Sequence, residues 1–322
     1  MSRSGCSPTF RITPTGRCSY VIGVDAGGTS TRALAVARDG TVVGRGSSGG
    51  ANPNSHPPEE AVAHIEEAIR AALGDRDPHD VDGCTVGMAG TSKLSDPAVA
   101  ALFDAAWKRL GLDRVLVLSD AEVAFASATA SPDGTVLVAG TGSIAGRIRD
   151  HRVVATMGGY GWLLGDEGSA FWLGREAVRW TLDELSAGTT LGALSRSVLH
   201  EAGLDDTERS EVWRRLITVA NGEPPIRLAR FAPLVSAAPD AGPIIERAAE
   251  LLVETAMAVR EPAENTPIVL VGSVLAGPVG TLVRKRLSDL PVHTSSDGVL
   301  GAAWLAALAA YGVNANRPKQ GI

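Results

Sequence analysis

Short apolar runs and helical patterns alternate along the first third of the chain. The apolar runs, each bounded by polar or glycine-rich turns, predict strands at residues 20–24, 33–37, 41–44, 84–88 and 115–118. Residues 58–74 repeat apolar side chains every four positions, which predicts an amphipathic helix, and a second helix is predicted at about 96–110. Strands that alternate with helices at this spacing indicate an α/β sheet with crossover connections.

The same order of elements returns in the second half. The segments that begin at Val21 (VIGVDAGGTSTRALAVARDGTVVGRG) and at Val136 (VLVAGTGSIAGRIRDHRVVATMGG) share one layout: strand, glycine-hydroxyl turn, strand, tight turn, strand. Alternating helices and strands follow, at 241–260, 268–271, 277–289, 291–293 and 299–311. This agreement indicates a duplicated fold. We predict a disordered leader at 1–19, domains at 20–118 and 119–322, and a helical insertion at about 167–233.

Charge and composition exclude several classes of protein. The chain has 322 residues and a net charge of -6, and no stretch concentrates basic side chains, which argues against a nucleic-acid partner. Cys6, Cys18 and Cys84 are widely spaced, which indicates a reducing compartment without structural zinc. No apolar run reaches the ~18 residues of a membrane span, and residues 1–19 lack the apolar core of a signal peptide. We therefore expect a cytoplasmic protein with no membrane partner.

Two glycine-hydroxyl turns are the first candidates for chemistry. One contains Gly27, Gly28, Thr29 and Ser30, and the other contains Gly140, Thr141, Gly142 and Ser143. Such a turn exposes backbone N–H groups that point the same way and can bind phosphate oxygens, and glycine permits the close approach. Either turn alone is also compatible with an ordinary hairpin. Two of them at equivalent places of a repeat predict nucleotide binding from both sides of a cleft. Neither is a P-loop, because no Gly-Lys-Ser/Thr follows.

Two aspartates lie at predicted strand ends. Asp25 directly precedes the first turn, where it either caps that turn or holds Mg²⁺ against the phosphates of a nucleotide. Asp120 follows the strand at 115–118 and opens a helix. It is therefore either a helix N-cap or a general base that accepts the proton of an attacking hydroxyl.

Residues 158–169 (GGYGWLLGDEGS) form the densest segment of the chain. Its glycines, two aromatic residues and two adjacent acids are typical of a loop that closes around a small polar ligand; the alternative is a surface loop with a helix cap at Asp166. Asn52, Asn54 and Ser55 lie in a polar loop where turn residues are the default interpretation, and His56 shows no metal-ligand spacing. The turn at Gly272-Ser273 would let the backbone approach an adenine ring.

Together these motifs resemble the acetate and sugar kinase–Hsc70–actin ATPase superfamily, and within it the BadF/BadG-type group that includes N-acetylglucosamine kinase. The resemblance covers nearly the whole chain. It rests on VDAGGTST, VGMAG at 86–90, SDA at 119–121, AGTGS at 139–143, GGYGWLLGDEGSAFWLG at 158–174 and VGSVLAGP at 271–278.

The resemblance implies duplicated ribonuclease-H-like (actin-like ATPase) domains of the α/β class, with ATP in the cleft between them. It places Asp25 near Mg²⁺, both glycine turns at the phosphates, and Gly272 with Ser273 at the adenosine. It assigns Asp120 as the base for a sugar 6-hydroxyl. The residues it assigns to the sugar are Asn52, Gly90, Asp120, Gly159, Tyr160 and Asp166.

Some positions depart from the family pattern. Tyr160 stands where the vertebrate enzyme has tryptophan, which puts the contacts beside the sugar in doubt. Cys84 cannot supply the iron–sulfur ligands of the acyl-CoA dehydratase activators, and the Cys/His zinc motif of ROK sugar kinases is absent.

We expect an ATP:amino-sugar 6-phosphotransferase that uses ATP and Mg²⁺ and acts as a homodimer. N-acetylglucosamine is the favoured substrate. Glucosamine and N-acetylmuramate are alternatives, and the alternative of another class is a non-kinase ATPase that activates or senses a partner protein.

Overall fold

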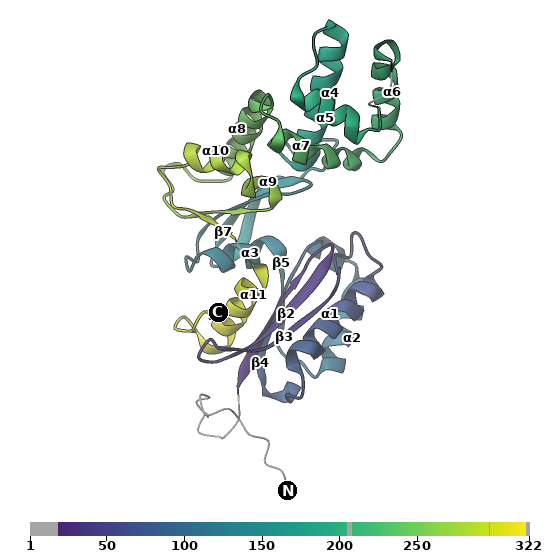
Figure 1. Ribbon diagram of the computed structural model, residues 1–322. Helices are drawn as coiled ribbons and strands as arrows, with labels where there is room; N and C mark the ends of the chain where they lie inside the picture. Colours follow the sequence, from purple (N-terminus) through teal and green to yellow (C-terminus); the bar gives the residue numbers. More distant parts are fainter. Residues whose placement is uncertain (1–18, 205–207, 296, 320–322) are drawn as a thin grey trace. The chain divides into compact units, whose positions relative to one another are not determined.

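The computed structural model describes residues 19–204, 208–295 and 297–319. The predicted leader lies, apart from Ser19, outside these residues. The chain divides into two compact units, the first formed by residues up to 130 together with those from 295 onward, and the second by residues 131–294. Each unit contains one five-stranded sheet (Figure 1). No helix in the described parts of the chain is long and apolar enough to cross a membrane.

The sheet of the first unit is covered by helices on both faces. β1 (Tyr20–Ala26) is buried except at Asp25: Ile22 and Val24 pack against α1 (Pro58–Leu73) and α2 (Pro97–Leu110), whereas Val21 packs against α11 (Gly298–Tyr311) on the opposite face. This explains why β1 is a continuous apolar run rather than an alternating one. In sheet order the strands are β3 (Val42–Gly49), β2 (Ser30–Ala37), β1 (Tyr20–Ala26), β4 (Val81–Met88) and β5 (Val115–Ser119). The helices are α1 (Pro58–Leu73), α2 (Pro97–Leu110), α3 (Asp120–Ala128) and α11 (Gly298–Tyr311), with short 3₁₀ turns η1 (Pro78–Asp80) and η2 (Thr91–Ser95).

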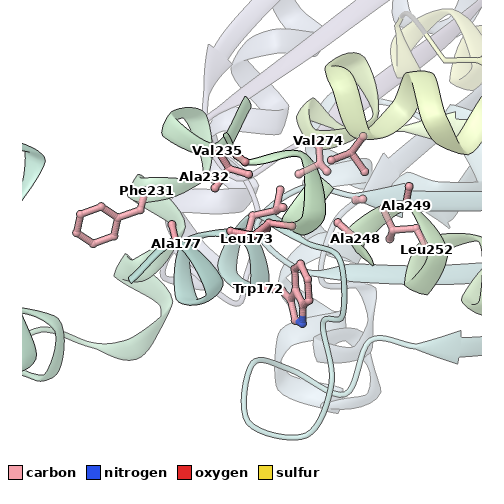
Figure 2. Packing of buried hydrophobic residues seen from close by; sticks show 14 of the residues in the cluster. Trp172, Leu173, Ala177, Phe231, Ala232, Val235, Ala248, Ala249, Leu252 and Val274 are labelled. Atoms are coloured by element: carbon pink, nitrogen blue, oxygen red, sulfur yellow. The ribbon is translucent and has the colours of Figure 1, made fainter. Parts of the chain in front are cut away.

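The second unit repeats this sheet and adds a group of helices. In sheet order its strands are β8 (Arg152–Gly158), β7 (Ser143–Arg149), β6 (Gly134–Ala139), β9 (Ile268–Val271) and β10 (Val292–Thr294). Its helices are α4 (Ala170–Ala187), α5 (Ala193–Glu201), α6 (Arg209–Asn221), η3 (Pro225–Phe231), α7 (Ala232–Ala237), α8 (Gly242–Ala258), α9 (Ser273–Ala276) and α10 (Pro278–Arg286). Helix α8 packs on β6, β7 and β8. Helix α4 packs against η3, α7 and α8 through Trp172, Leu173 and Ala177 (Figure 2).

The two sheets have the same topology. In each, three consecutive strands form an antiparallel meander, and the next two strands are added in parallel on the other side of the first strand. A helix precedes each added strand, α1 and α2 in the first unit and α8 and α10 in the second. The α/β class and the duplicated ribonuclease-H-like fold predicted from the sequence are confirmed.

The compact units divide the chain differently from the boundary predicted between residues 118 and 119. Helices α3 and α11 both belong to the first unit. They pack on each other, and α11 also covers β1 and β4. Helix α11 is apolar around most of its circumference because it is enclosed between the sheet and α3. The sequence-based boundary followed chain order, which cannot show that the last helix returns to the first sheet. The predicted insertion at about 167–233 corresponds to α4, α5, α6 and η3.

Glycines in the first sheet control how closely α11 approaches it. A Cβ on Gly23 would lie 2.1 Å from the backbone nitrogen of Ala303, whereas a Cβ on Gly83 would lie 3.7 Å from the nearest atom of α11, an ordinary contact. We expect Gly23→Ala to lower the free energy of unfolding by about 1–3 kcal/mol because the helix must move away. Gly83→Ala, the matched control, should leave stability unchanged or raise it slightly. Urea unfolding measures both, and equal effects would contradict this account of the packing.

Candidate functional site

The carboxyl ends of three strands meet at one edge of the first sheet. Ala26 of β1 is in register with Met88 of β4, and Met88 with Ser119 of β5. Asp25 near the end of β1 therefore lies beside the first glycine turn, Gly90 and Asp120, which follow β1, β4 and β5. In open parallel sheets, ligands bind outside this edge.

Asp25 is held by an ion pair that the sequence analysis missed. Arg32 lies directly opposite Asp25 in the β1–β2 hairpin, and its Nη2 is 2.5 Å from Asp25 Oδ2. Its Nη1 is 2.9 Å from Asp297, whose side chain caps α11 by accepting from the Val299 N–H. The hairpin register was the available signal, because pairing β1 with β2 across the glycine turn puts Arg32 beside Asp25.

The two candidate carboxylates have altered pKa values. Burial raises the pKa of Asp25 above its usual range, and Arg32 offsets part of this effect. Loss of hydration also raises the pKa of Asp120, although its side chain remains accessible to solvent. A hydrogen bond from the Ala121 N–H opposes that rise, while the negative charge of Asp25 adds to it. The charge of Asp25 thus acts on the Asp120 carboxylate.

Asp120 is the first residue of α3 but does not cap it. The cap is Ser119, whose side chain accepts from the Glu122 N–H, while the Glu122 side chain accepts from the Ser119 N–H. This reciprocal pair is a capping box. Of the two interpretations left open for Asp120 by the sequence, the N-cap is therefore wrong.

Asn52 and Gly90 come together beside this edge. Asn52 Oδ1 accepts from the Asn54 N–H at 2.9 Å. A Cβ on Gly90 would lie only 2.4 Å from the same oxygen, and Gly90 has a positive φ of 76°. Only glycine fits this corner without displacing Asn52.

The first glycine turn presents its hydroxyls unequally. The Gly27 N–H donates to the Ser30 carbonyl at 3.0 Å and closes the turn, leaving Gly28, Thr29 and Ser30 exposed. The Thr31 side chain, in contrast, is buried and donates to the Gly49 carbonyl at 2.8 Å.

In the second unit, the second glycine turn is braced by Asp166. This side chain is buried, and its Oδ1 accepts from the Ser143 N–H at 3.1 Å. A Cβ on Gly142 would lie 2.7 Å from the same oxygen, so a larger residue there would displace the carboxylate. Helix α4 is capped by Ser169, which accepts from the Trp172 N–H, so Asp166 is not its cap.

Gly272 and Ser273 lie beside the second turn because β9 pairs in parallel with β6. Gly272 has a φ of 106°, and a Cβ there would be 2.4 Å from the Ala139 carbonyl oxygen. Both residues are exposed, as is Thr141.

Gly159 is tied to the same turn, because its N–H donates to the Ser143 carbonyl at 2.9 Å. Tyr160 is 59% exposed, and its hydroxyl donates to the sulfur of Met157, which is not a candidate residue, at 3.6 Å.

The structure therefore gathers the candidate residues into one group in each unit. The first unit brings together Asp25, Gly27, Gly28, Thr29, Ser30, Asn52, Gly90 and Asp120. The second brings together Gly140, Thr141, Gly142, Ser143, Gly159, Asp166, Gly272 and Ser273. Each group lies at the carboxyl ends of the central parallel strands of its own sheet.

Comparison with known proteins finds two curated relatives that are both named as kinases. Over 164 residues the chain is 32% identical to an N-acetylmuramic acid/N-acetylglucosamine kinase of Clostridium acetobutylicum, a match covering 50% of this chain and 52% of that protein. Over 186 residues it is 30% identical to an N-acetyl-D-glucosamine kinase of Dictyostelium discoideum, covering 53% and 57%. The chain thus spans about half the length of these curated relatives.

Similarity of structure and sequence extends over most of the chain. The crystal structure of a candidate N-acetylglucosamine kinase from Chromobacterium violaceum is similar with a TM-score of 0.69 and 25% identity, covering 90% of this chain and 99% of that one. The sequence model of the BadF/BadG/BcrA/BcrD ATPase family matches residues 22–306. The chain therefore belongs to the BadF/BadG/BcrA/BcrD ATPase family.

Proposed function

We propose that this protein is a kinase that transfers the γ-phosphoryl group of ATP to the 6-hydroxyl of an amino sugar, with N-acetylglucosamine as the favoured substrate. The family is one of ATPases, and both curated relatives are named as kinases of N-acetylglucosamine. The proposal includes the homodimer and the cytoplasmic location expected from the sequence.

The state of Asp120 carries the proposal. Its helix is already capped by Ser119 and Glu122, so Asp120 is not needed to begin α3. Reduced hydration raises its pKa, which makes it a better proton acceptor than an ordinary aspartate. In the proposed reaction Asp120 accepts the proton of the 6-hydroxyl. The hydroxyl oxygen then bonds to the γ-phosphorus as the bond to the leaving oxygen of ADP breaks.

Asp25 fits a role in holding Mg²⁺. Mg²⁺ keeps several waters and is usually bound through one or two carboxylates together with substrate phosphates. The half-buried Asp25 carboxylate next to the exposed Thr29 and Ser30 provides such a donor, and no larger group of three or more ligands occurs among the described residues. Bound Mg²⁺ would neutralise charge on the β- and γ-phosphates. Arg32 keeps Asp25 in place from the opposite strand.

Asp166 supports the second phosphate turn in this proposal, in addition to the contact with sugar hydroxyls that the family resemblance implies. Its described bond is to the Ser143 N–H, inside the turn that would receive the phosphates. A buried carboxylate that accepts from backbone N–H groups fixes their direction. We therefore propose that Asp166 orients the Ser143 N–H of the second phosphate turn.

The first test is ADP release with N-acetylglucosamine, glucosamine, N-acetylmuramate, glucose and N-acetylmannosamine, with ³¹P NMR of the product. We expect release to depend on sugar, to be fastest with N-acetylglucosamine, and to yield the sugar 6-phosphate. Release of ADP that is the same with and without every sugar would contradict the kinase and favour an ATPase that acts on a partner protein.

The second test is Asp120→Asn. We expect kcat to fall by about 10²–10⁴, because the base is removed while the Ser119 cap remains. A raised pKa in the folded protein means that ionisation of Asp120 costs stability, so its favourable contribution is complete at low pH and is lost as the pH rises through the folded-state pKa. The variant should therefore be at least as stable as the wild type at pH 7.

Urea unfolding at pH 7 and at low pH measures the stability difference, which should shrink in acid. Asp113→Asn, an exposed acid that precedes β5, is the control and should keep wild-type turnover. Turnover near wild type in Asp120→Asn would remove Asp120 from the mechanism.

The third test compares Asp166→Ala with Asp166→Asn. The alanine variant leaves the Ser143 N–H without its acceptor, which should cost about 1–3 kcal/mol and raise the KM for ATP as well as for sugar. Asparagine keeps an acceptor oxygen and tolerates the positive φ of 60° at this position, so its effects should be smaller. Thermal unfolding and steady-state kinetics measure both. A rise in sugar KM alone, with stability unchanged, would show that Asp166 does not brace the turn.

A further inference from the structure

The loop formed by residues 50–56 lies against the first glycine turn and bonds to it twice. The Ala51 N–H donates to the Gly27 carbonyl at 2.9 Å. His56 Nε2 lies 2.9 Å from the Gly28 carbonyl oxygen. The loop and the turn are so close that a Cβ on Gly50 would be 2.2 Å from the Gly28 oxygen and 2.6 Å from His56 Nε2. The loop thus fixes two successive carbonyl groups of the turn.

These two bonds also fix the direction of the neighbouring N–H groups. In a trans peptide, the C=O of one residue and the N–H of the next point in opposite directions. Because the carbonyls of Gly27 and Gly28 face the loop, the N–H groups of Gly28 and Thr29 face away from it. Among the described residues, neither N–H has an acceptor. Two adjacent N–H groups that point to the same side form an anion-binding nest.

The His56 ring is held in place on several sides. A carbonyl oxygen only accepts hydrogen bonds, so Nε2 must carry the proton that it shares with Gly28. Nδ1 lies 3.6 Å from Glu60 Oε1, one helical turn away. The ring also meets His64 edge to face at 6.3 Å, and His64 Nδ1 in turn lies 2.7 Å from the Gly50 carbonyl oxygen. The donor at Nε2 is therefore preorganised.

The same loop carries Asn52, one of the residues that the family resemblance assigns to the sugar. The Asn52 carbonyl accepts from the N–H groups of both Ser55 and His56, at 3.0 Å each. The His56 backbone is thus joined to Asn52, whose side chain lies next to Gly90. The loop of residues 50–56 thus contacts both the first glycine turn and Gly90.

We propose that His56 is a positioning residue that, through the Gly28 carbonyl, aims the Thr29 N–H at the nucleotide phosphates and couples that turn to Asn52. The inference rests on the proposed function, because it requires that the first turn binds nucleotide. Since the two sites share the loop, a sugar that orders Asn52 also orders the phosphate turn, and bound sugar tightens nucleotide binding.

The test compares His56→Gln, His56→Asn and His56→Ala. The amide nitrogen of glutamine can replace Nε2, whereas that of asparagine is too short to reach the Gly28 oxygen. We expect the asparagine and alanine variants to weaken ADP binding and to raise the KM for ATP about fivefold to tenfold, the effect of one lost hydrogen bond. Their kcat should stay near the wild-type value, because His56 does not contact reacting atoms. The glutamine variant should remain close to wild type in both respects.

Calorimetric titration of the full chain with ADP, with and without N-acetylglucosamine, gives the binding constants directly. Tightening of ADP by the sugar should be seen in the wild type and in His56→Gln and be lost in His56→Asn. His79→Ala, an exposed histidine next to the amino end of β4, is the matched control and should change nothing.

Equal ADP affinity in the glutamine and asparagine variants would overturn the positioning role, whether both match the wild type or both lose binding. A wild-type protein that binds ADP but phosphorylates no sugar would remove the kinase proposal and still leave the comparison of variants decisive. A wild-type protein that does not bind ADP would overturn both proposals.

Discussion

Parallel pairing of neighbouring strands is the constraint on which both groups of candidate residues depend. β1 pairs in parallel with β4, and β6 with β9, so loops that are far apart in sequence leave each sheet at the same edge. A hydrogen-bonded ladder fixes this alignment to within one residue, since a shift of one would turn every side chain to the other face. The position of Asp120 relative to Asp25 is therefore determined by the pairing of β1 with β4 and of β4 with β5, and the polar residues need not secure it themselves.

The candidate residues also require that the backbone comes close to polar side chains, and glycine permits this approach. At Gly90 and Gly142 a single added carbon would displace the side chain of Asn52 or Asp166. In both cases the side chain and the glycine come from different segments of the chain. Each glycine thus leaves space that a side-chain oxygen of its polar partner occupies.

Local patterns in the sequence predicted the fold well, because each strand ends in a recognisable turn and the order of elements repeats. The same patterns located both glycine turns and the aspartates beside them. Sequence could not decide whether Asp120 caps its helix, because Ser119 and Asp120 are both good caps and only the capping box with Glu122 distinguishes them. It also missed the contacts that Arg32 and His56 make. Arg32 is found opposite Asp25 only when the register of the β1–β2 hairpin is known. His56 contacts the Gly28 carbonyl across 28 residues of the sequence, a contact that only the folded structure shows.

The return of α11 to the first sheet has a consequence for synthesis of the protein. Residues 131–294 form the second unit without a break in the sequence, so all of its residues have been made once residue 294 has been added. The first unit starts earlier but lacks the helix that covers β1 and β4 until residues 298–311 have been added. Domains generally fold as units during translation. Here the order is inverted: the sheet of the first unit is made early, but α11, which covers β1 and β4, is made only after the whole second unit.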